Sequence, residues 1–154
     1  VGEDPVAALA DLRARRIAVP KVQVSACLEV REAAGLDRLL AFAEPRYLHQ
    51  TVAQNGPRAL DLDEVALRRA EFAAAGCVRS HYHVPIYWDE DGPFGSTRGE
   101  VERVLAAWAA AGDGLPLLEV ETYTWSVLGG FDAGQALAER IARELAFAAS
   151  CFRR

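Results

Sequence analysis

Helix-like and strand-like patterns alternate along almost the whole chain, and this alternation limits the fold more than any other feature of the sequence. Apolar residues recur at helical spacing over residues 4–16, 35–43, 61–75, 99–111 and 132–152. Strand-like segments cover residues 21–26, 46–52, 77–86 and 115–125, and turn-forming residues fill 54–57 and the long loop 88–99. This order is typical of α/β folds with parallel strands.

The length of the chain sets the size of that fold. A complete (β/α)8 barrel takes about 250 residues, and this chain has 154. An open α/β sheet and half of a barrel both fit, and the polar residues of the strands favour the barrel. We therefore predict a partial (half) TIM barrel of about four βα units with parallel strands. Residues 1–154 would form a single domain, the C-terminal portion of a (β/α)8 barrel.

The two ends of the chain allow two interpretations. The chain contains no methionine and begins directly on a helix cap, Asp4 followed by Pro5. Removal of the initiator from a protein poor in methionine would explain this. The other interpretation is that these residues are part of a longer chain.

Several strand-like segments carry polar side chains on one face, although buried parallel strands are normally apolar on both. These faces hold Lys21, Gln23 and Ser25, then His49, then His81 and His83, and finally Glu119 and Glu121. Burying such groups without partners is costly, so they should satisfy one another or bind a cation. Imidazole, carboxylate and amide ligands together suit Mn²⁺, Mg²⁺, Zn²⁺ or Fe²⁺.

These residues also have ordinary structural interpretations. The two acidic residues of the last strand could form a buried salt bridge with Arg79 or Lys21. Gln23 could be a hydrogen-bonded core amide, and His49 could be a strand-end residue in water. Both interpretations stay open at the level of the sequence.

Two further features could contact a substrate. Ser96, Thr97 and Arg98 open the helix predicted at 99–111, where backbone N–H groups favour a phosphate or carboxylate. Ordinary helix capping by Ser96 or Thr97 explains the same residues equally well. Trp125 follows the last strand and could stack on a sugar ring, or it could simply cap the core.

Composition and charge exclude several classes of protein. The net charge is −5, and the arginines are spread along helices among Asp and Glu, which argues against a nucleic-acid surface. No apolar run approaches the roughly 20 residues of a membrane span, and the first residues do not form a secretory signal. Three distant cysteines suit reduced thiols, so we expect a cytoplasmic protein.

Five motifs occur together in a recognisable order. They are KVQVS at 21–25, YLHQ at 47–50, HYHVP at 81–85, GST at 95–97 and LEVETYTW at 118–125. The chain resembles the EboE-type metabolite-traffic family, whose members belong to the xylose-isomerase-like TIM-barrel superfamily of sugar isomerases and epimerases. The resemblance covers nearly the whole chain, and the last motif is its most specific part.

The resemblance implies a metal site and a reaction. Glu121 stands where the superfamily places its last metal ligand, His83 best matches the preceding histidine with His81 as the alternative, and Gln23 occupies another strand-end polar position. The earlier acidic ligands would lie upstream of Val1, so the site would be incomplete here. The metal would polarise a substrate carbonyl, and Glu119 or His81 would move a proton at the adjacent carbon.

Substrate and partners follow from the same hypothesis. The ligand would be a sugar-like small molecule touched by His49, Ser96, Thr97, Arg98 and Trp125. The alternative is a non-catalytic protein that binds or carries a small metabolite. An endonuclease for damaged DNA is a third interpretation, which the acidic charge opposes. Exposed sheet edges predict a homo-oligomer or pairing with a missing N-terminal half.

Overall fold

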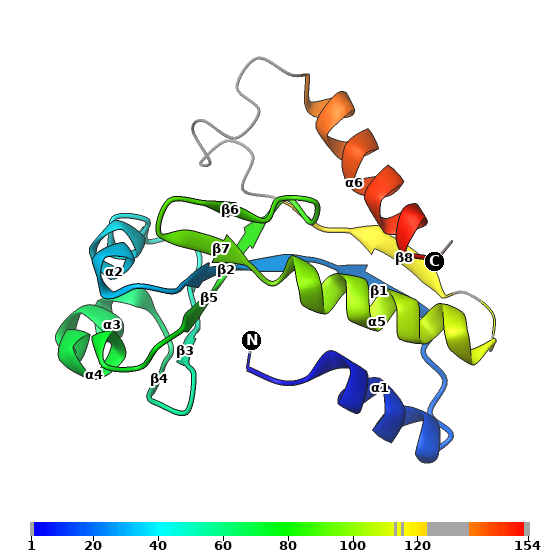
Figure 1. The fold of residues 1–154 in the computed structure, drawn as a ribbon, viewed down its shortest axis with the longest axis horizontal. Coiled ribbons are helices and arrows are strands. Elements are labelled where there is room, and N and C mark those ends of the chain that lie inside the picture. The colour runs from blue at the N-terminus through cyan, green and yellow to red at the C-terminus, as the bar shows by residue number, and fades with distance from the viewer. Residues whose placement is uncertain (1, 113, 115, 123–135, 153–154) are drawn as a thin grey trace. The chain divides into compact units, whose positions relative to one another are not determined.

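In the computed structural model the chain forms two compact units (Figure 1). The structure describes residues 2–112, 114, 116–122 and 136–152. The first unit contains residues 27–82 and 89–96 together with Gly2. The second contains 3–26, 83–88 and the described residues from 97 onward. The single domain predicted from the sequence stays a prediction.

A six-stranded sheet forms the centre of the first unit, with the strand order β4-β3-β5-β2-β7-β6. Its strands are β2 (Ala26–Val30), β3 (Thr51–Ala53), β4 (Arg58–Ala59), β5 (Val78–Val84), β6 (Glu90–Asp91) and β7 (Phe94–Ser96). Strand β3 pairs antiparallel with both β4 and β5, and β7 pairs antiparallel with both β2 and β6. Most of this sheet is therefore antiparallel.

Three short helices pack in the same unit: α2 (Ala33–Leu40), α3 (Leu62–Leu67) and α4 (Arg69–Ala73). Asp61 caps α3 by accepting a hydrogen bond from the N–H of Leu62 at 2.8 Å. Arg69 of α4 forms an ion pair with Asp37 of α2 at 2.7 Å. The apolar sides of the three helices contribute Leu36, Leu39, Leu62, Val65 and Phe72 to the core.

The second unit contains the parallel strand pair β1 (Lys21–Val24) and β8 (Leu117–Val120). Its helices are α1 (Pro5–Ala14), α5 (Arg98–Ala111) and α6 (Leu137–Cys151), and α1 lies beside α5 (Figure 1). Asp4 caps α1 as predicted, accepting from the N–H of Val6 at 2.9 Å. Arg103 of α5 donates to the same Asp4 at 2.9 Å, so one carboxylate caps one helix and holds its neighbour. No helix in the described part of the chain is long and apolar enough to cross a membrane.

The predicted half TIM barrel with parallel strands is wrong. The loop predicted at 88–99 contains two antiparallel strands, β6 and β7, joined by Gly92 and Pro93. Gly92 has φ +59°, which suits the first position of a two-residue hairpin turn. Such a turn joins only antiparallel strands, because parallel strands need a crossover of a dozen or so residues. The β3–β4 hairpin also reverses the chain, through residues 54–57.

Candidate functional site

The strand register of the first unit places two arginines on one face of the sheet. Val52 of β3 pairs with Arg58 of β4 on one side and with Arg79 of β5 on the other. Directly paired residues point to the same face, and adjacent strands are about 4.8 Å apart, so the two arginine Cα atoms are about 10 Å apart. One position along, Thr51 and Ser80 point to the opposite, buried face, where their hydroxyls are 3.1 Å apart.

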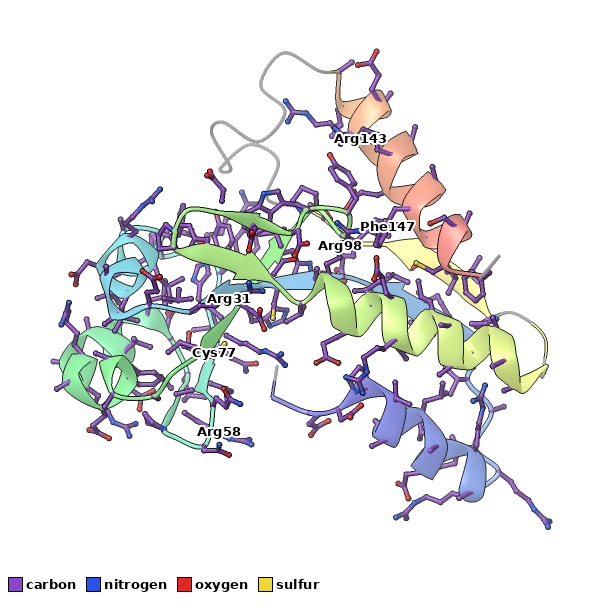
Figure 2. All side chains as sticks on the ribbon, in the orientation of Figure 1. Arg31, Arg58, Cys77, Arg98, Arg143 and Phe147 are labelled. Atoms are coloured by element: carbon purple, nitrogen blue, oxygen red, sulfur yellow. The ribbon has the colours of Figure 1, made fainter. Side chains whose placement is uncertain are left out.

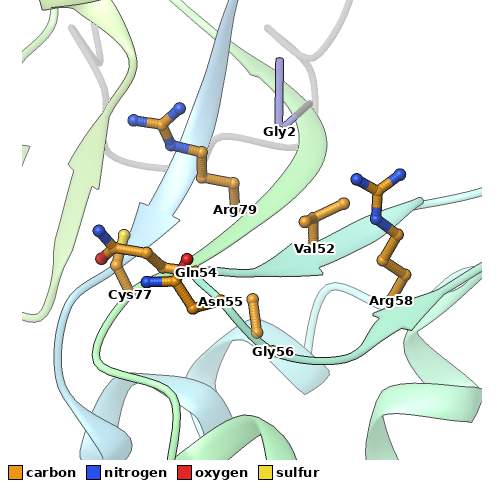
Figure 3. Close-up of a pocket in the computed structure, with 9 residues that line it drawn as sticks. Gly2, Val52, Gln54, Asn55, Gly56, Arg58, Cys77 and Arg79 are labelled. Atoms are coloured by element: carbon orange, nitrogen blue, oxygen red, sulfur yellow. The ribbon is translucent and has the colours of Figure 1, made fainter. Parts of the chain in front are cut away.

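A cavity of about 430 Å³ lies over this part of the sheet (Figure 3). Arg58 and Arg79 stand on either side of Val52 in its wall, and Gln54, Asn55 and Cys77 complete its polar lining. The cavity volume falls within the range of small-ligand sites, about 300–1,000 Å³. The described lining contains no acidic residue. We call this space the arginine cavity.

The β3–β4 hairpin places the two amide side chains at the cavity. The N–H of Ala53 donates to the carbonyl of Pro57 at 2.9 Å, and the N–H of Gln54 donates to the carbonyl of Cys77 at 2.7 Å. Asn55 has φ +54°, a left-handed conformation that asparagine tolerates better than most residues. The predicted turn at 54–57 is therefore confirmed, and it forms one end of the arginine cavity.

The carboxylate of Glu29 on β2 forms ion pairs with Arg79 and with Arg31. Its Oε1 accepts from Nε of Arg79 at 2.7 Å, and its Oε2 accepts from Arg31 at 3.3 Å. The Glu29 side chain is only 8% exposed, so this carboxylate is removed from most of the solvent and compensated by two cations. Arg31 also bonds to Glu90 of β6 at 3.2 Å.

The Cys77 thiol contributes no negative charge to the cavity at neutral pH. Burial raises the pKa of Cys77, and the nearby charge of Glu29 raises it further, while Arg79 and Arg31 oppose both effects. The thiol therefore stays protonated at neutral pH and does not reduce the positive charge of the arginines.

Three residues predicted as site residues belong to the first unit. His49 is buried, stacks on Tyr82 with ring centroids 5.4 Å apart, and has Nδ1 3.5 Å from Oδ1 of Asp61. His81 is half-buried on β5, two residues from Arg79. Ser96 is buried on β7 opposite Leu28. None of the three lines the arginine cavity.

His83 and Glu121, both predicted as metal ligands, lie together in the second unit. Nδ1 of His83 is 2.6 Å from the main-chain oxygen of Glu121. This contact is with the main chain of Glu121, so any residue at position 121 could make it. Nδ1 must carry the proton for this contact to be a hydrogen bond.

The other strand residues of the second unit lie on the exposed face of the β1–β8 pair. Gln23 and Glu119 are cross-strand partners, and both are exposed. Glu119 accepts from Nζ of Lys21 at 2.9 Å. The salt bridge considered for Glu119 is present with Lys21, at the surface instead of in the interior.

At the start of α5, the side chains contact the protein itself. Arg98 pairs with Glu102 at 3.2 Å, donates to the carbonyl of Tyr87 at 3.2 Å, and lies over the ring of Phe147 (Figure 2). Thr97 is the N-cap residue, and its side chain makes no capping hydrogen bond. The predicted stacking residue Trp125 lies outside the described residues.

The described residues do not fit the predicted divalent metal. In residues 2–112, 114, 116–122 and 136–152, no three His, Cys, Asp or Glu side chains lie close enough to hold an ion. Gln23 is exposed, and His83 uses Nδ1 on a main-chain oxygen. The metal stays a prediction, and no chemical step is derived from it.

Sequence reasoning missed Glu144, which is 1% exposed on α6. Its Oε1 accepts from the hydroxyl of Thr122 at 2.5 Å and from the N–H of Ile86 at 3.1 Å. Burial raises the pKa of Glu144, although both hydrogen bonds oppose the shift. The signal was present in the sequence, since Glu144, Ala148 and Cys151 recur at the spacing of one buried helix face.

Arg58 and Arg79 were also missed as a pair. The alternation of β5 places Arg79 on the same face of the strand as His81, so its position on the polar face was predictable. Its proximity to Arg58 was not, because it depends on β3 pairing with both of its neighbours.

The fold and this site define an α/β chain with an arginine-lined polar cavity on a mainly antiparallel sheet. No protein-family model, curated protein or solved structure matches the chain. The predicted family, sugar-like ligand and homo-oligomer therefore stay predictions.

Proposed function

We propose that the chain binds a small anionic metabolite in the arginine cavity and does not transform it. The observation that carries this proposal is the placement of Arg58 and Arg79 on either side of Val52, in a cavity of about 430 Å³ without an acidic lining residue. This is the non-catalytic alternative of the sequence hypothesis, located on different residues.

The chemistry of the lining suits an oxyanion. A guanidinium group matches a carboxylate or phosphate in shape and charge and can donate two parallel hydrogen bonds to it. Arg58 is exposed, and within the described ranges no carboxylate forms an ion pair with its guanidinium. The anion would therefore not have to displace a protein carboxylate from Arg58.

The remaining lining suits a polar organic body. The side-chain amides of Gln54 and Asn55 offer donors and acceptors to hydroxyl groups, and Val52 offers an apolar surface between the arginines. Because the chain carries a net charge of −5, an anion needs a local cationic site to be attracted at all. The two arginines provide that site.

Isothermal titration calorimetry with sugar acids and sugar phosphates at low salt tests the proposal. We expect Arg58→Ala and Arg79→Ala each to weaken binding by at least about tenfold, as for loss of a charge-assisted hydrogen bond. Arg46→Ala is the matched control, since Arg46 is an exposed arginine of the same unit that lies against Tyr47. Affinity that survives Arg58→Ala, or no binding at millimolar ligand, would contradict the proposal.

The sugar isomerase or epimerase activity predicted from the resemblance is a second candidate. Two residues that the resemblance implies as metal ligands, His83 and Glu121, lie close together in the second unit, although their contact is through the main-chain oxygen of Glu121. Turnover assays with aldose and ketose sugars, with Mn²⁺ or with a chelator, distinguish the two candidates. Turnover that requires the metal and is lost in Glu121→Ala would support the enzyme and contradict a non-catalytic role.

A further inference from the structure

Glu29 links Arg79, which lines the arginine cavity, to Arg31, which lies outside its lining. It is not a lining residue of the cavity, yet its carboxylate is bonded to Nε of the lining residue Arg79 at 2.7 Å. Arg79 therefore lines the cavity while its guanidinium is already paired with the carboxylate of Glu29. Arg58, on the other side of Val52, has no such partner among the described residues.

The second cation bonded to Glu29 is Arg31, whose guanidinium lies against the backbone of β7 at Gly95. A Cβ atom at Gly95 would lie 2.8 Å from both Cζ and Nη2 of Arg31, so only glycine leaves room for this guanidinium across the strand. In that position Arg31 reaches Glu29 at 3.3 Å and Glu90 at 3.2 Å. Arg31 is thus shared between the carboxylates of Glu29 and Glu90.

The charges nearest the cavity then add up to a single excess positive charge. Arg58, Arg79 and Arg31 contribute three positive charges, Glu29 and Glu90 contribute two negative charges, and the Cys77 thiol contributes none. A ligand with one negative charge matches this balance. A second negative charge on the ligand would be repelled by Glu29, whose side chain is only 8% exposed and is therefore less screened than a surface charge.

We propose that Glu29 makes the arginine cavity selective for monoanions, so that its ligands are carboxylate metabolites such as sugar acids and not phosphate monoesters. This inference rests on the proposed function, because it names the ligand class of the same cavity. Glu29 acts through Arg79 and is a positioning and selectivity residue.

Two probes at pH 8 and low salt test the selectivity by calorimetry on the full chain. Glucuronate carries one negative charge, and glucose 6-phosphate carries two at this pH because the second phosphate pKa is about 6. We expect the wild-type chain to bind glucuronate more tightly. In Glu29→Gln, which keeps the side-chain shape and an oxygen acceptor for Arg79, we expect the preference to shift toward glucose 6-phosphate by about five- to tenfold.

Glu32→Gln is the matched control, since it removes the same charge from an exposed residue three positions away that makes no side-chain cap to α2. It should change the ratio of the two affinities by less than about twofold. A second measurement covers the case in which Glu29→Gln does not fold. The wild-type chain should bind the methyl phosphodiester of glucose 6-phosphate, a monoanion, more tightly than the parent dianion.

The outcomes separate the two claims. If the wild-type chain binds neither probe, the proposed function is wrong. If it binds both probes but prefers the dianion, or if Glu29→Gln leaves the ratio unchanged, binding stands and the selectivity role of Glu29 is wrong.

Discussion

The hydroxyl of Thr122 donates to the carboxyl group of Glu144 at 2.5 Å, between the end of β8 and the buried side of α6. The same oxygen also accepts from the N–H of Ile86, so one side chain joins three segments of the second unit. Because burial raises its pKa, Glu144 is easier to protonate in the folded chain than in the unfolded chain. We therefore expect the stability of the second unit to depend on pH through this residue.

The sign of that dependence follows from the raised pKa. The stabilisation from protonated Glu144 is complete below the unfolded pKa, near the ordinary value of 4.5, and is lost as the pH rises through the folded pKa. Glu144→Gln, which is neutral at every pH, should flatten the Tm profile between pH 4 and 8 and raise Tm at the upper end. Glu139→Gln, an exposed glutamate on the same helix, should leave the profile unchanged. Superimposable profiles for wild type and Glu144→Gln would contradict this prediction.

Asp61 should stabilise the first unit through two backbone donors. Its Oδ1 accepts from the N–H of Leu62 at 2.8 Å and from the N–H of His49 at 3.1 Å. Asp61→Ala loses the helix cap and leaves a donor without its partner, so we expect a loss of about 2–3 kcal/mol in urea unfolding at pH 7. Asp63→Ala, an exposed change in the first turn of the same helix, should cost less than about 0.5 kcal/mol.

The effect of Asp61 should also depend on pH, with the opposite sign to that of Glu144. Burial raises the pKa of Asp61, but the hydrogen bonds from His49 and Leu62 outweigh burial and lower it overall. The stabilisation is therefore present above the unfolded value, near 3.8, and is lost as the pH falls through the folded pKa. The stability difference between wild type and Asp61→Ala should shrink between pH 5 and pH 3. An unchanged difference would mean that the carboxylate charge plays no part.

Gly95 should be required for the position of Arg31. In Gly95→Ala the new methyl group would displace the guanidinium, which is the mobile end of a long side chain, so we expect a loss of only about 1 kcal/mol. Gly76→Ala is the control, because no atom lies within 4 Å of the Cβ that it would add. Thermal unfolding measures both variants. Equal Tm values, with Arg31 still bonded to Glu29 in a crystal structure of Gly95→Ala, would contradict the prediction.

Arg58→Lys should separate charge from geometry in the arginine cavity. Lysine keeps the positive charge but cannot donate two parallel hydrogen bonds, so anion affinity should fall by about threefold to tenfold, less than in Arg58→Ala. Affinity of the wild-type chain should also fall as salt is raised, because the site is open to solvent. A lysine variant as weak as the alanine variant would contradict this prediction, because the positive charge by itself would then contribute nothing to binding.

Local signals in the sequence predicted the helices well. Asp4 and Pro5 begin α1 because the cap and the fixed φ of proline act within one turn of chain. Gly112 ends α5 with φ +70°, as expected of a residue without a Cβ after a helix predicted to stop at 111. The helix predicted at 61–75 instead divides into α3 and α4 at Arg68, which has φ −110°.

The same local signals failed for the strands, because a strand-like pattern does not identify the strand with which it pairs. Gly92 and Pro93 carried a hairpin signal inside a segment interpreted as a loop, and the hairpin they form pairs with β2, more than 60 residues away in the chain. The strands of this hairpin pair antiparallel, and β3 pairs antiparallel with both of its neighbours. This pairing excludes the parallel barrel on which the prediction of the metal site was based.

The amino-acid sequence by itself determined which segments become helices, which residues cap them and which strand positions are polar, since these properties depend on contacts a few residues apart. Only the tertiary structure decided that Arg58 and Arg79 stand on either side of Val52, and that Glu29 and Glu144 are buried with their partners. These arrangements depend on the pairing and register of distant strands, where a shift of one residue would turn each arginine to the opposite face of the sheet.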